Sequence, residues 1–287
     1  AKQKRYLNVM INKQIDLYQS FKKERNGATG GFLTVYACTE SKELKRRIHP
    51  CVLIIPGGGY SVLSDREGEP VALKYLNEGY IPFILSYSLK TKYPTPLNEV
   101  MLAMAYIRSN ANEYNIDKDN VCVVGFSAGG HLAGLLATAT NEEVDQNNMQ
   151  EENIKPKAVI LSYPVVTMGK FTHSDSRRII CGGDKMLYDK LSVEKRVEQS
   201  TPPTFIWHTA EDDCVPVENS LLLANSCATL NVPFALHIFE KGWHGLSTCE
   251  IETNDTEGHS FFKENAKWFN LSLDWLKSRG FEVKTSG

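Results

Sequence analysis

Short apolar runs rich in β-branched residues alternate with stretches of helical periodicity from about residue 50 to the C-terminus. Near-continuous apolar strands separated by helices are typical of a parallel sheet that is covered on both faces. The expected strands are residues 51–55, 81–86, 121–125, 158–162, 204–208 and 234–239. The expected helices are residues 69–77, 97–110, 128–140, 216–230 and 261–278. The alternation therefore predicts an α/β fold with a mostly parallel central sheet and helices on both faces.

The segments outside this alternation complete the predicted organisation. Residues 14–19 and 32–37 are expected to be antiparallel edge strands joined by the glycine-containing segment 26–31, and the polar residues 141–157 a solvated surface loop. Residues 164–203 are longer than a strand-to-helix connection should be. We expect them to form a small cap, a lid or specificity insertion, with an ordinary surface excursion as the alternative. With no repeat and no linker, residues 1–287 are predicted to be a single domain.

Composition excludes several classes of function. The 287 residues are 42% hydrophobic and 23% charged, with a formal net charge of -2. This balance argues against a nucleic-acid partner, and no run approaches the roughly 20 apolar residues of a membrane span. The N-terminal stretch has positive charge but no apolar signal-peptide core. Seven cysteines without regular spacing favour reduced thiols, so we predict a cytoplasmic protein with no membrane partner.

A serine stands where a predicted strand meets a predicted helix, in the sequence VCVVGFSAGGHLAG at 121–134. The pentapeptide GFSAG at 125–129 matches G-x-S-x-G, with a strand before it and an Ala/Leu-rich helix after it. The tight turn between them requires small neighbours and exposes the hydroxyl of Ser127. The helix N-terminus behind it offers free N–H groups and the positive end of a dipole. Ser127 is therefore the predicted nucleophile.

A serine hydroxyl is a poor nucleophile unless a base removes its proton and an acid orients that base. Two later strands are followed by such residues. The strand 204–208 leads to Asp212, with Asp213 as the alternative acid, and the strand 234–239 leads to His244 in the sequence KGWHG. Catalytic triads occur in several chain orders, and serine followed by acid and then histidine is one of them. Asp212 and His244 are therefore the predicted partners of Ser127.

The sequence IIPGGGY at 54–60 follows an early strand and supplies a second part of the site. Acyl transfer passes through a tetrahedral intermediate whose negative oxygen needs N–H donors. We expect one donor to be the backbone of Ala128, and the others to come from this loop, because three glycines let the backbone approach a substrate closely. A phosphate-binding loop is excluded, since no Lys-Ser/Thr follows and GGG is not G-x-G-x-x-G.

With these residues in order, the sequence resembles the α/β-hydrolase superfamily. Within it, the chain is similar to the acetyl esterase/lipase group that includes bacterial carbohydrate and feruloyl-type esterases. The matching stretches, spanning roughly residues 50 to 250, are IIPGGGYSVLSDREGEPVA, VVGFSAGGHLAG, TPPTFIWHTAEDDCVPVENSLLLA and HIFEKGWHGL. One departure is Pro56, which stands where the hormone-sensitive-lipase-like branch carries a histidine.

The resemblance implies hydrolysis of a carboxylic ester, with a short acyl group and especially an acetyl group on a sugar. It implies that Ser127 attacks the carbonyl, His244 acts as base and then acid, and Asp212 orients the imidazole. The N–H groups that would hold the oxyanion are those of Gly58, Gly59 and Ala128. It implies no metal and no organic cofactor. The expected partner is a small ester, an acetylated carbohydrate, and a homo-oligomer is left open.

Two other functions remain as alternatives at this stage. A serine peptidase of the prolyl-oligopeptidase type shares this fold and triad, although 287 residues leave no room for its usual propeller domain. A non-catalytic binding protein of the same fold is the other, although such proteins typically lose a triad residue. Of the remaining histidines, His131 is expected to pack or hydrogen-bond locally and His208 to end its strand, while His173 lies in the 164–203 insertion.

Overall fold

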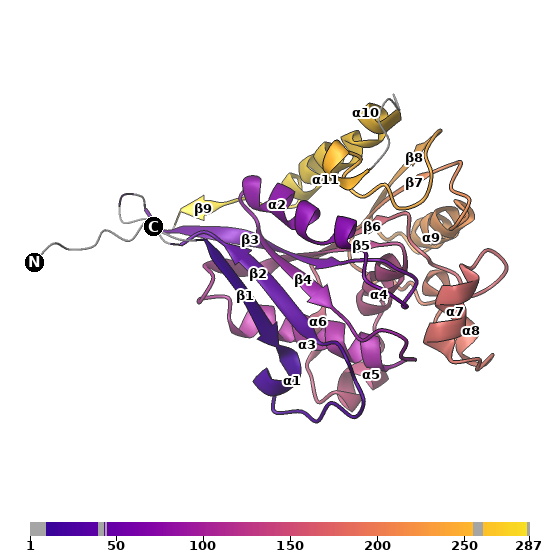
Figure 1. Ribbon diagram of the computed structural model, residues 1–287, viewed down its shortest axis with the longest axis horizontal. Helices are drawn as coiled ribbons and strands as arrows, with labels where there is room; N and C mark the ends of the chain where they lie inside the picture. The colour runs from indigo at the N-terminus through magenta and orange to yellow at the C-terminus, as the bar shows by residue number, and fades with distance from the viewer. Residues whose placement is uncertain (1–9, 40–42, 44, 255–260, 286–287) are drawn as a thin grey trace, which may run out of the picture.

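The computed structural model describes residues 10–39, 43, 45–254 and 261–285. Within those ranges the strands form one sheet in the order β1-β2-β4-β3-β5-β6-β7-β8, with β9 paired to β3 (Figure 1). The strands are β1 (Ile11–Asp16), β2 (Phe32–Ala37), β3 (Arg47–Ile55), β4 (Ile81–Ser86), β5 (Ile116–Phe126), β6 (Ala158–Ser162), β7 (Thr204–Thr209), β8 (Phe234–Phe239) and β9 (Lys284–Thr285). Neighbours from β4 through β8 are parallel, and β1, β2 and β9 pair antiparallel. The predicted mostly parallel sheet is confirmed.

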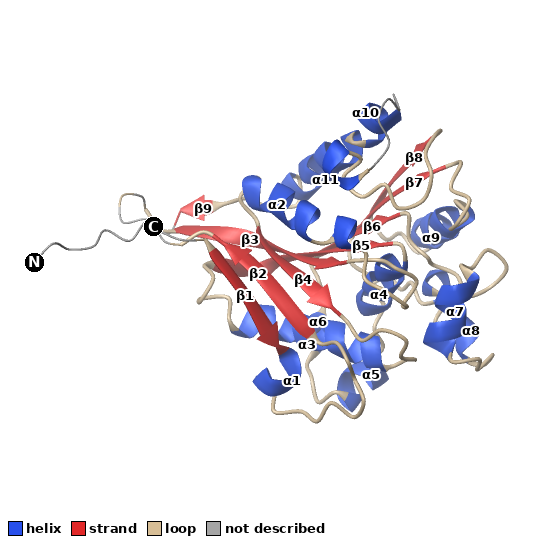
Figure 2. Cartoon of the chain, viewed as in Figure 1, coloured by secondary structure: helices blue, strands red, loops and turns tan. Residues whose placement is uncertain are grey.

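Helices cover both faces of the sheet (Figure 2). The helices are α1 (Leu17–Ser20), α2 (Glu69–Asn77), α3 (Thr95–Ser109), α4 (Ala128–Ala137), α5 (Asn141–Gln146), α6 (Glu151–Ile154), α7 (Ser174–Cys181), α8 (Leu187–Lys190), α9 (Glu218–Thr229), α10 (Phe261–Asn265) and α11 (Lys267–Lys277), with the 3₁₀ turns η1 (Asp65–Glu67), η2 (Val193–Lys195) and η3 (Ile251–Thr253). In β3, Cys51, Leu53 and Ile55 join the core under α3, α4 and α9, whereas Val52 and Ile54 join the core under α2 and α11. Successive side chains of a strand point to opposite faces, so a continuous apolar run fills both layers.

The N-terminal edge differs from the predicted strand 14–19. The strand β1 starts earlier and ends at Asp16, whose carboxylate caps α1 by accepting a hydrogen bond from the backbone N–H of Gln19 at 3.1 Å. Aspartate is a favoured residue at a helix N-terminus because it satisfies one of the free N–H groups there. The second half of the predicted strand is therefore helix, while the antiparallel pairing of β1 with β2 is as expected.

The predicted surface loop 141–157 is wrong, because it contains the short helices α5 and α6. The helix α5 begins with a capping box, in which Thr140 and Glu143 each bond the other's backbone N–H. Val144 and Ile154 are buried in the core. Their two side chains anchor a segment whose composition is otherwise that of a solvated loop.

Other boundaries shift while the elements remain. The predicted helix 128–140 ends at Ala137, where the hydroxyl of Thr138 donates to the carbonyl of Gly134 at 2.8 Å. The predicted C-terminal helix 261–278 is divided at Ala266 into α10 and α11. The segment 164–203 holds α7, α8 and η2 beyond the end of β6 (Figure 1). In the described part of the chain, no helix combines the length and apolar character that a membrane crossing requires.

Candidate active site

Ser127 occupies the single residue between β5 and α4, with φ 52° and ψ -118°. This left-handed conformation is strained for a residue with a side chain and persists only where the surroundings hold it. The Ser127 N–H donates to the carbonyl of Ser162 at 3.0 Å. An added Cβ at Gly129 would lie 2.1 Å from the carbonyl oxygen of Ile55, and one at Gly125 would lie 2.4 Å from the carbonyl oxygen of Gly129. Only glycine fits at both positions, which explains the motif.

The loop after β8 brings His244 to this corner. Its Nε2 lies 2.7 Å from the Oγ of Ser127, and its Nδ1 lies 2.7 Å from Oδ2 of Asp212. Ser127 is 7% exposed, the His244 side chain 17% and the Asp212 side chain 0%. The three side chains therefore form one hydrogen-bonded line that runs from the partly accessible imidazole and hydroxyl to a fully buried carboxylate.

Asp212 is held by four hydrogen bonds, two to each carboxylate oxygen. Oδ1 accepts the backbone N–H groups of Cys214 at 3.0 Å and Val215 at 2.8 Å. Oδ2 faces His244 and also Nε2 of His208 at 3.2 Å. Burial opposes ionisation, but the hydrogen bonds from His208 and His244 outweigh it and hold the pKa of Asp212 well below its ordinary value. The carboxylate is therefore charged at neutral pH and fixes the orientation of the imidazole.

His208 has a larger role than the predicted end of a strand. Its Nε2 faces both the carboxylate of Asp212 and the carbonyl of Val215, at 2.9 Å from the latter, so that nitrogen carries the proton. Its Nδ1 lies 2.7 Å from the hydroxyl of Ser220. The alternative acid, Asp213, is exposed, whereas Asp212 is buried beside both histidines. The geometry therefore favours Asp212 of the two.

The glycine loop that follows β3 turns its carbonyl groups inward. The carbonyl of Gly57 accepts the N–H of Ser64 at 3.1 Å, and the carbonyl of Gly58 accepts the N–H of Val62 at 3.1 Å. Gly58 has φ 118°, which L side chains rarely adopt. A Cβ there would also lie 2.2 Å from the carbonyl oxygen of Val62. The carbonyls of Gly57 and Gly58 are thus used by hydrogen bonds within the loop itself.

The same loop lies directly against the nucleophile. An added Cβ at Gly57 would stand 2.8 Å from the Cβ of Ser127. Among the residues that the structure describes, no acceptor takes the backbone N–H of Gly58, Gly59 or Ala128. Ala128 is the first residue of α4, so its N–H is one of those that a helix leaves free. The predicted oxyanion donors thus come from the loop after β3 and from the start of α4. Their N–H groups make no hydrogen bond within the described residues.

The segment 164–203 contributes His173 to the rim of this site. Its Cε1 lies 3.4 Å from the position that a Cβ on Gly59 would take, and its Nδ1 lies 2.8 Å from the hydroxyl of Ser176. Burial lowers the pKa of His173, and the nearby His244 lowers it further. The N-terminus of α7 is therefore beside the glycine loop, which the sequence left undecided.

His131 is confirmed as a locally bonded histidine. Its Nδ1 lies 2.7 Å from the hydroxyl of Tyr60, and its Nε2 lies 2.7 Å from the carbonyl of Leu191. Burial lowers its pKa to about 4, so the ring is neutral, with the proton on Nε2. It ties the glycine loop, α4 and the 164–203 segment together without reaching Ser127.

Two buried side chains beside the site were not indicated by any sequence pattern. Glu67 accepts the N–H of Gly57 at 2.7 Å and the hydroxyl of Tyr163 at 2.7 Å. The ring of Tyr163 packs edge-on against His244, with ring centroids 5.0 Å apart. Neither residue belongs to a motif of fixed spacing, because 96 positions separate them in the chain.

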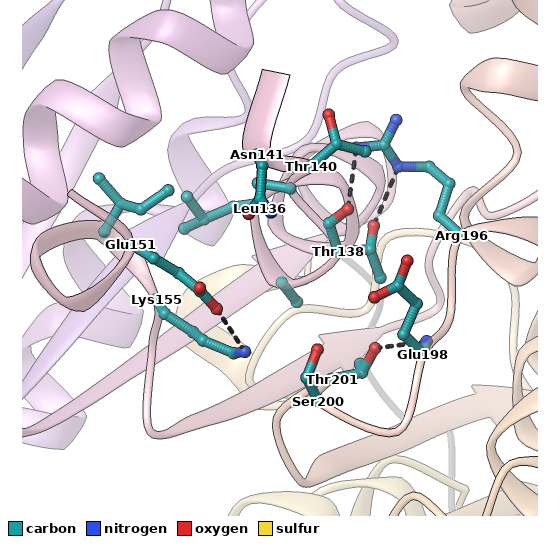
Figure 3. Close-up of a pocket in the computed structure, with 13 residues that line it drawn as sticks. Leu136, Thr138, Thr140, Asn141, Glu151, Lys155, Arg196, Glu198, Ser200 and Thr201 are labelled. Atoms are coloured by element: carbon teal, nitrogen blue, oxygen red, sulfur yellow. Dashed lines mark hydrogen bonds and ion pairs between the residues drawn. The ribbon is translucent and has the colours of Figure 1, made fainter. Parts of the chain in front are cut away.

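A separate cavity of about 260 Å³ lies at the C-terminal end of α4 (Figure 3). It is lined by Leu136–Asn141, Glu151, Ile154, Lys155, Arg196, Glu198, Ser200 and Thr201. Its polar groups largely bond one another: Arg196 donates to Thr138, and Lys155 pairs with Glu151 (Figure 3). None of the Ser127–His244–Asp212 side chains lines it. Within the described ranges, no three His, Cys, Asp or Glu side chains come together so as to hold a metal ion.

The model of the BD-FAE family matches residues 35–227 of this chain. Over 237 residues the chain is 40% identical to the endo-1,4-beta-xylanase B of Butyrivibrio fibrisolvens. This alignment covers 78% of this chain and 36% of the xylanase. Over 233 residues it is 31% identical to the acetylxylan esterase of Xylanibacter ruminicola, covering 78% of this chain and 44% of the esterase. The chain thus spans less than half the length of either relative.

A solved structure resembles the whole described fold. The crystal structure of an acetyl ester-xyloside bifunctional hydrolase from Caldicellulosiruptor lactoaceticus matches with a TM-score of 0.79 and 35% identity. The match covers 94% of this chain and 97% of that one. The similarity in fold therefore extends over nearly the whole chain.

Proposed function

This chain belongs to the BD-FAE family and has the α/β-hydrolase fold, and from that premise we propose that it hydrolyses carboxylic esters through Ser127, His244 and Asp212. The observation that carries the proposal is the unbroken line of contacts, 2.7 Å from Oγ to Nε2 and 2.7 Å from Nδ1 to Oδ2. The charged carboxylate of Asp212 accepts the hydrogen bond from Nδ1 of His244 and so holds a proton on that nitrogen. Nε2 is then free to accept the proton of Ser127.

In the acylation step, the Oγ of Ser127 bonds to the ester carbonyl carbon as its proton moves to Nε2 of His244. The carbonyl oxygen becomes an oxyanion, for which Gly58, Gly59 and Ala128 offer unused N–H groups. The intermediate then collapses: the ester C–O bond breaks, and the leaving alcohol takes the proton from His244. Water attacks the acyl-serine by the same route in reverse, releasing the acid and restoring Ser127. No metal or organic cofactor enters this sequence.

We propose acetyl groups on xylan-derived sugars as the substrate. One relative is named an acetylxylan esterase, another a xylanase, and the structural neighbour an acetyl ester-xyloside hydrolase. Each name describes that protein, and their shared reference to xylan or xylosides supports the choice for this chain. Crowding also supports a short acyl group, because Gly57 lies against Ser127 and His173 stands beside Gly59.

The segment 164–203 is proposed as the specificity region of a single domain. It carries His173 to the glycine loop, and α7 lines an open groove of about 620 Å³ together with Ser61 and Lys90. The lining of this groove includes Lys90, Lys92 and Arg178, whose side chains can donate hydrogen bonds to the hydroxyl groups of a sugar leaving group. The acyl group would then face the glycine loop, and the sugar would face α7.

The test measures acetate release from acetylated xylo-oligosaccharides and initial rates on p-nitrophenyl acetate. Replacing Ser127 by alanine should lower kcat by about 10³-fold or more, because it removes the nucleophile. A matched control is Ser278→Ala, an exposed serine just after α11, which should keep wild-type rates. Full activity in Ser127→Ala would show that the nucleophile is another residue.

The same preparations separate the two alternatives. A peptidase of the prolyl-oligopeptidase type would cleave an aminoacyl p-nitroanilide faster than the acetyl ester. A non-catalytic binding protein would leave a fluorophosphonate probe unreacted, whereas the proposed esterase is labelled at Ser127 and the Ser127→Ala variant is not. We expect the acetyl ester to be the better substrate and the probe to label the wild type.

A further inference from the structure

Glu67 is a buried carboxylate that the proton line does not use. It ends the 3₁₀ turn η1, between the glycine loop and α2, and is 3% exposed. Burying a carboxylate is costly unless hydrogen bonds compensate for the lost water. The bonds that hold Glu67 in place lead to two parts of the active site.

On one side, Glu67 holds the glycine loop. Its Oε2 accepts the N–H of Gly57 at 2.7 Å. That bond fixes the orientation of Gly57, where an added Cβ would lie 2.8 Å from the Cβ of Ser127. The next N–H groups, those of Gly58 and Gly59, are left for the substrate. Donors that are already in place before the reaction stabilise an oxyanion best, because no reorganisation is needed.

On the other side, Glu67 reaches the histidine loop through Tyr163. The Tyr163 hydroxyl donates to Oε1 of Glu67 at 2.7 Å and accepts the N–H of Ser247 at 2.9 Å. The same ring packs edge-on against His244 at 5.0 Å. A further bond joins the two segments, since the hydroxyl of Ser247 donates to the carbonyl of Arg66 at 2.5 Å. The loop that carries the base is therefore anchored to η1.

We propose that Glu67 is a positioning residue that sets the oxyanion loop and the histidine loop relative to each other, acting through Gly57 and Tyr163. The inference rests on the proposed function, because it assigns a catalytic use to both loops. Glu67 does not touch the reacting atoms. Its effect should fall on the transition state more than on substrate binding, since the tetrahedral oxyanion needs the aligned donors more than the planar ester does.

The chain contains a matched control in Glu99. This carboxylate is 0% exposed and, like Glu67, accepts a tyrosine hydroxyl and a backbone N–H, those of Tyr18 at 3.1 Å and Ser88 at 2.6 Å; it also accepts the hydroxyl of Ser88. Its bonds hold the start of α3 and the residues after β4, and they include no residue of the proton line. Glu67→Gln and Glu99→Gln therefore make the same chemical change in two places, of which one adjoins the site.

The experiment compares the wild type, Glu67→Gln, Glu99→Gln and Ser127→Ala by thermal unfolding and by kcat and KM on p-nitrophenyl acetate. In Glu67→Gln one oxygen can still accept a donor, but the NH₂ group faces the other donor. We expect kcat to fall about 10- to 100-fold with KM changed by less than about 3-fold, below the loss for deleting an oxyanion donor outright. Glu99→Gln should lose stability while its kcat stays within about twofold of wild type.

A folded Glu67→Gln with wild-type kcat would overturn the proposal, as would equal kcat losses in Glu67→Gln and Glu99→Gln. If Glu67→Gln does not fold, the kcat and KM of Tyr163→Phe test the proposal instead. This substitution removes the link to Ser247 but keeps the Gly57 bond, so kcat should fall about 3- to 10-fold at unchanged KM, and an unchanged kcat refutes the link. An active Ser127→Ala would instead refute the proposed function, so the two failures are distinguishable.

Discussion

Replacement of Asp212 by asparagine tests the proton line most directly, because the structure dictates how the amide must sit. Oδ1 of Asp212 faces two backbone N–H donors, at 3.0 and 2.8 Å. The asparagine oxygen should take that place, since an NH₂ group there would meet two donors, whereas at the Oδ2 position it would meet only the Nε2–H of His208, which also has the carbonyl of Val215 to donate to. The NH₂ group then replaces Oδ2, and its proton points at Nδ1 of His244. His244 can accept that proton only by carrying its own hydrogen on Nε2.

In this tautomer, the nitrogen 2.7 Å from the Oγ of Ser127 is already protonated and cannot act as a base. A triad that holds the wrong tautomer loses about 10⁴-fold in kcat, which corresponds to about 5 kcal/mol of transition-state stabilisation. Losing the charge of Asp212 also removes the stabilisation of the imidazolium that forms during acylation. Substrate binding involves none of these atoms, so we expect KM to change little.

The assay is kcat and KM on p-nitrophenyl acetate for Asp212→Asn and Asp213→Asn, with thermal unfolding to show that both are folded. Asp213 is exposed and next in the chain, so it is a matched control expected to keep wild-type rates. A folded Asp212→Asn within tenfold of the wild type would refute the tautomer argument. A larger loss in Asp213→Asn would identify that residue as the acid.

Two further predictions concern stability. Because the buried, neutral His131 resists protonation in the folded state whereas its unfolded form titrates near pH 6.5, the wild type should lose about 2 kcal/mol more stability than His131→Gln between about pH 7 and pH 4.5. The free energy of unfolding is measured by urea unfolding at each pH. If it falls equally in the two proteins between about pH 7 and pH 4.5, the prediction is contradicted. Arg196→Met should cost about 3–5 kcal/mol with kcat unchanged, because it strands Glu143, whose carboxylate is 2% exposed and lies 2.6 Å from Arg196. Chemical unfolding measures the loss, and a change below about 1 kcal/mol would show that Thr140 and Tyr93 suffice to hold the carboxylate.

The sequence was most informative where a backbone or packing requirement is met by residues that are neighbours in the chain. The corner at Ser127 needs small residues on both sides, and the glycines at 125 and 129 make that need visible in five letters. The buried parallel strands are equally visible, since both faces of β3 must be apolar. The failures were also local. The segment 141–157 reads as polar, yet two buried side chains and one capping box make it helical.

Local pattern was enough to predict the apolar strands of the sheet, the strained turn at Ser127, and the loops after β7 and β8 that carry the proposed acid and base, because each depends on backbone demands within a few residues. Only the folded chain decides that His208 and two N–H groups hold Asp212, that His173 borders Gly59, and that Glu67 meets Tyr163. Such contacts join buried polar groups from distant strands and turns. Each buried polar group needs a hydrogen-bond partner nearby in the folded protein, but that partner can come from any position in the sequence.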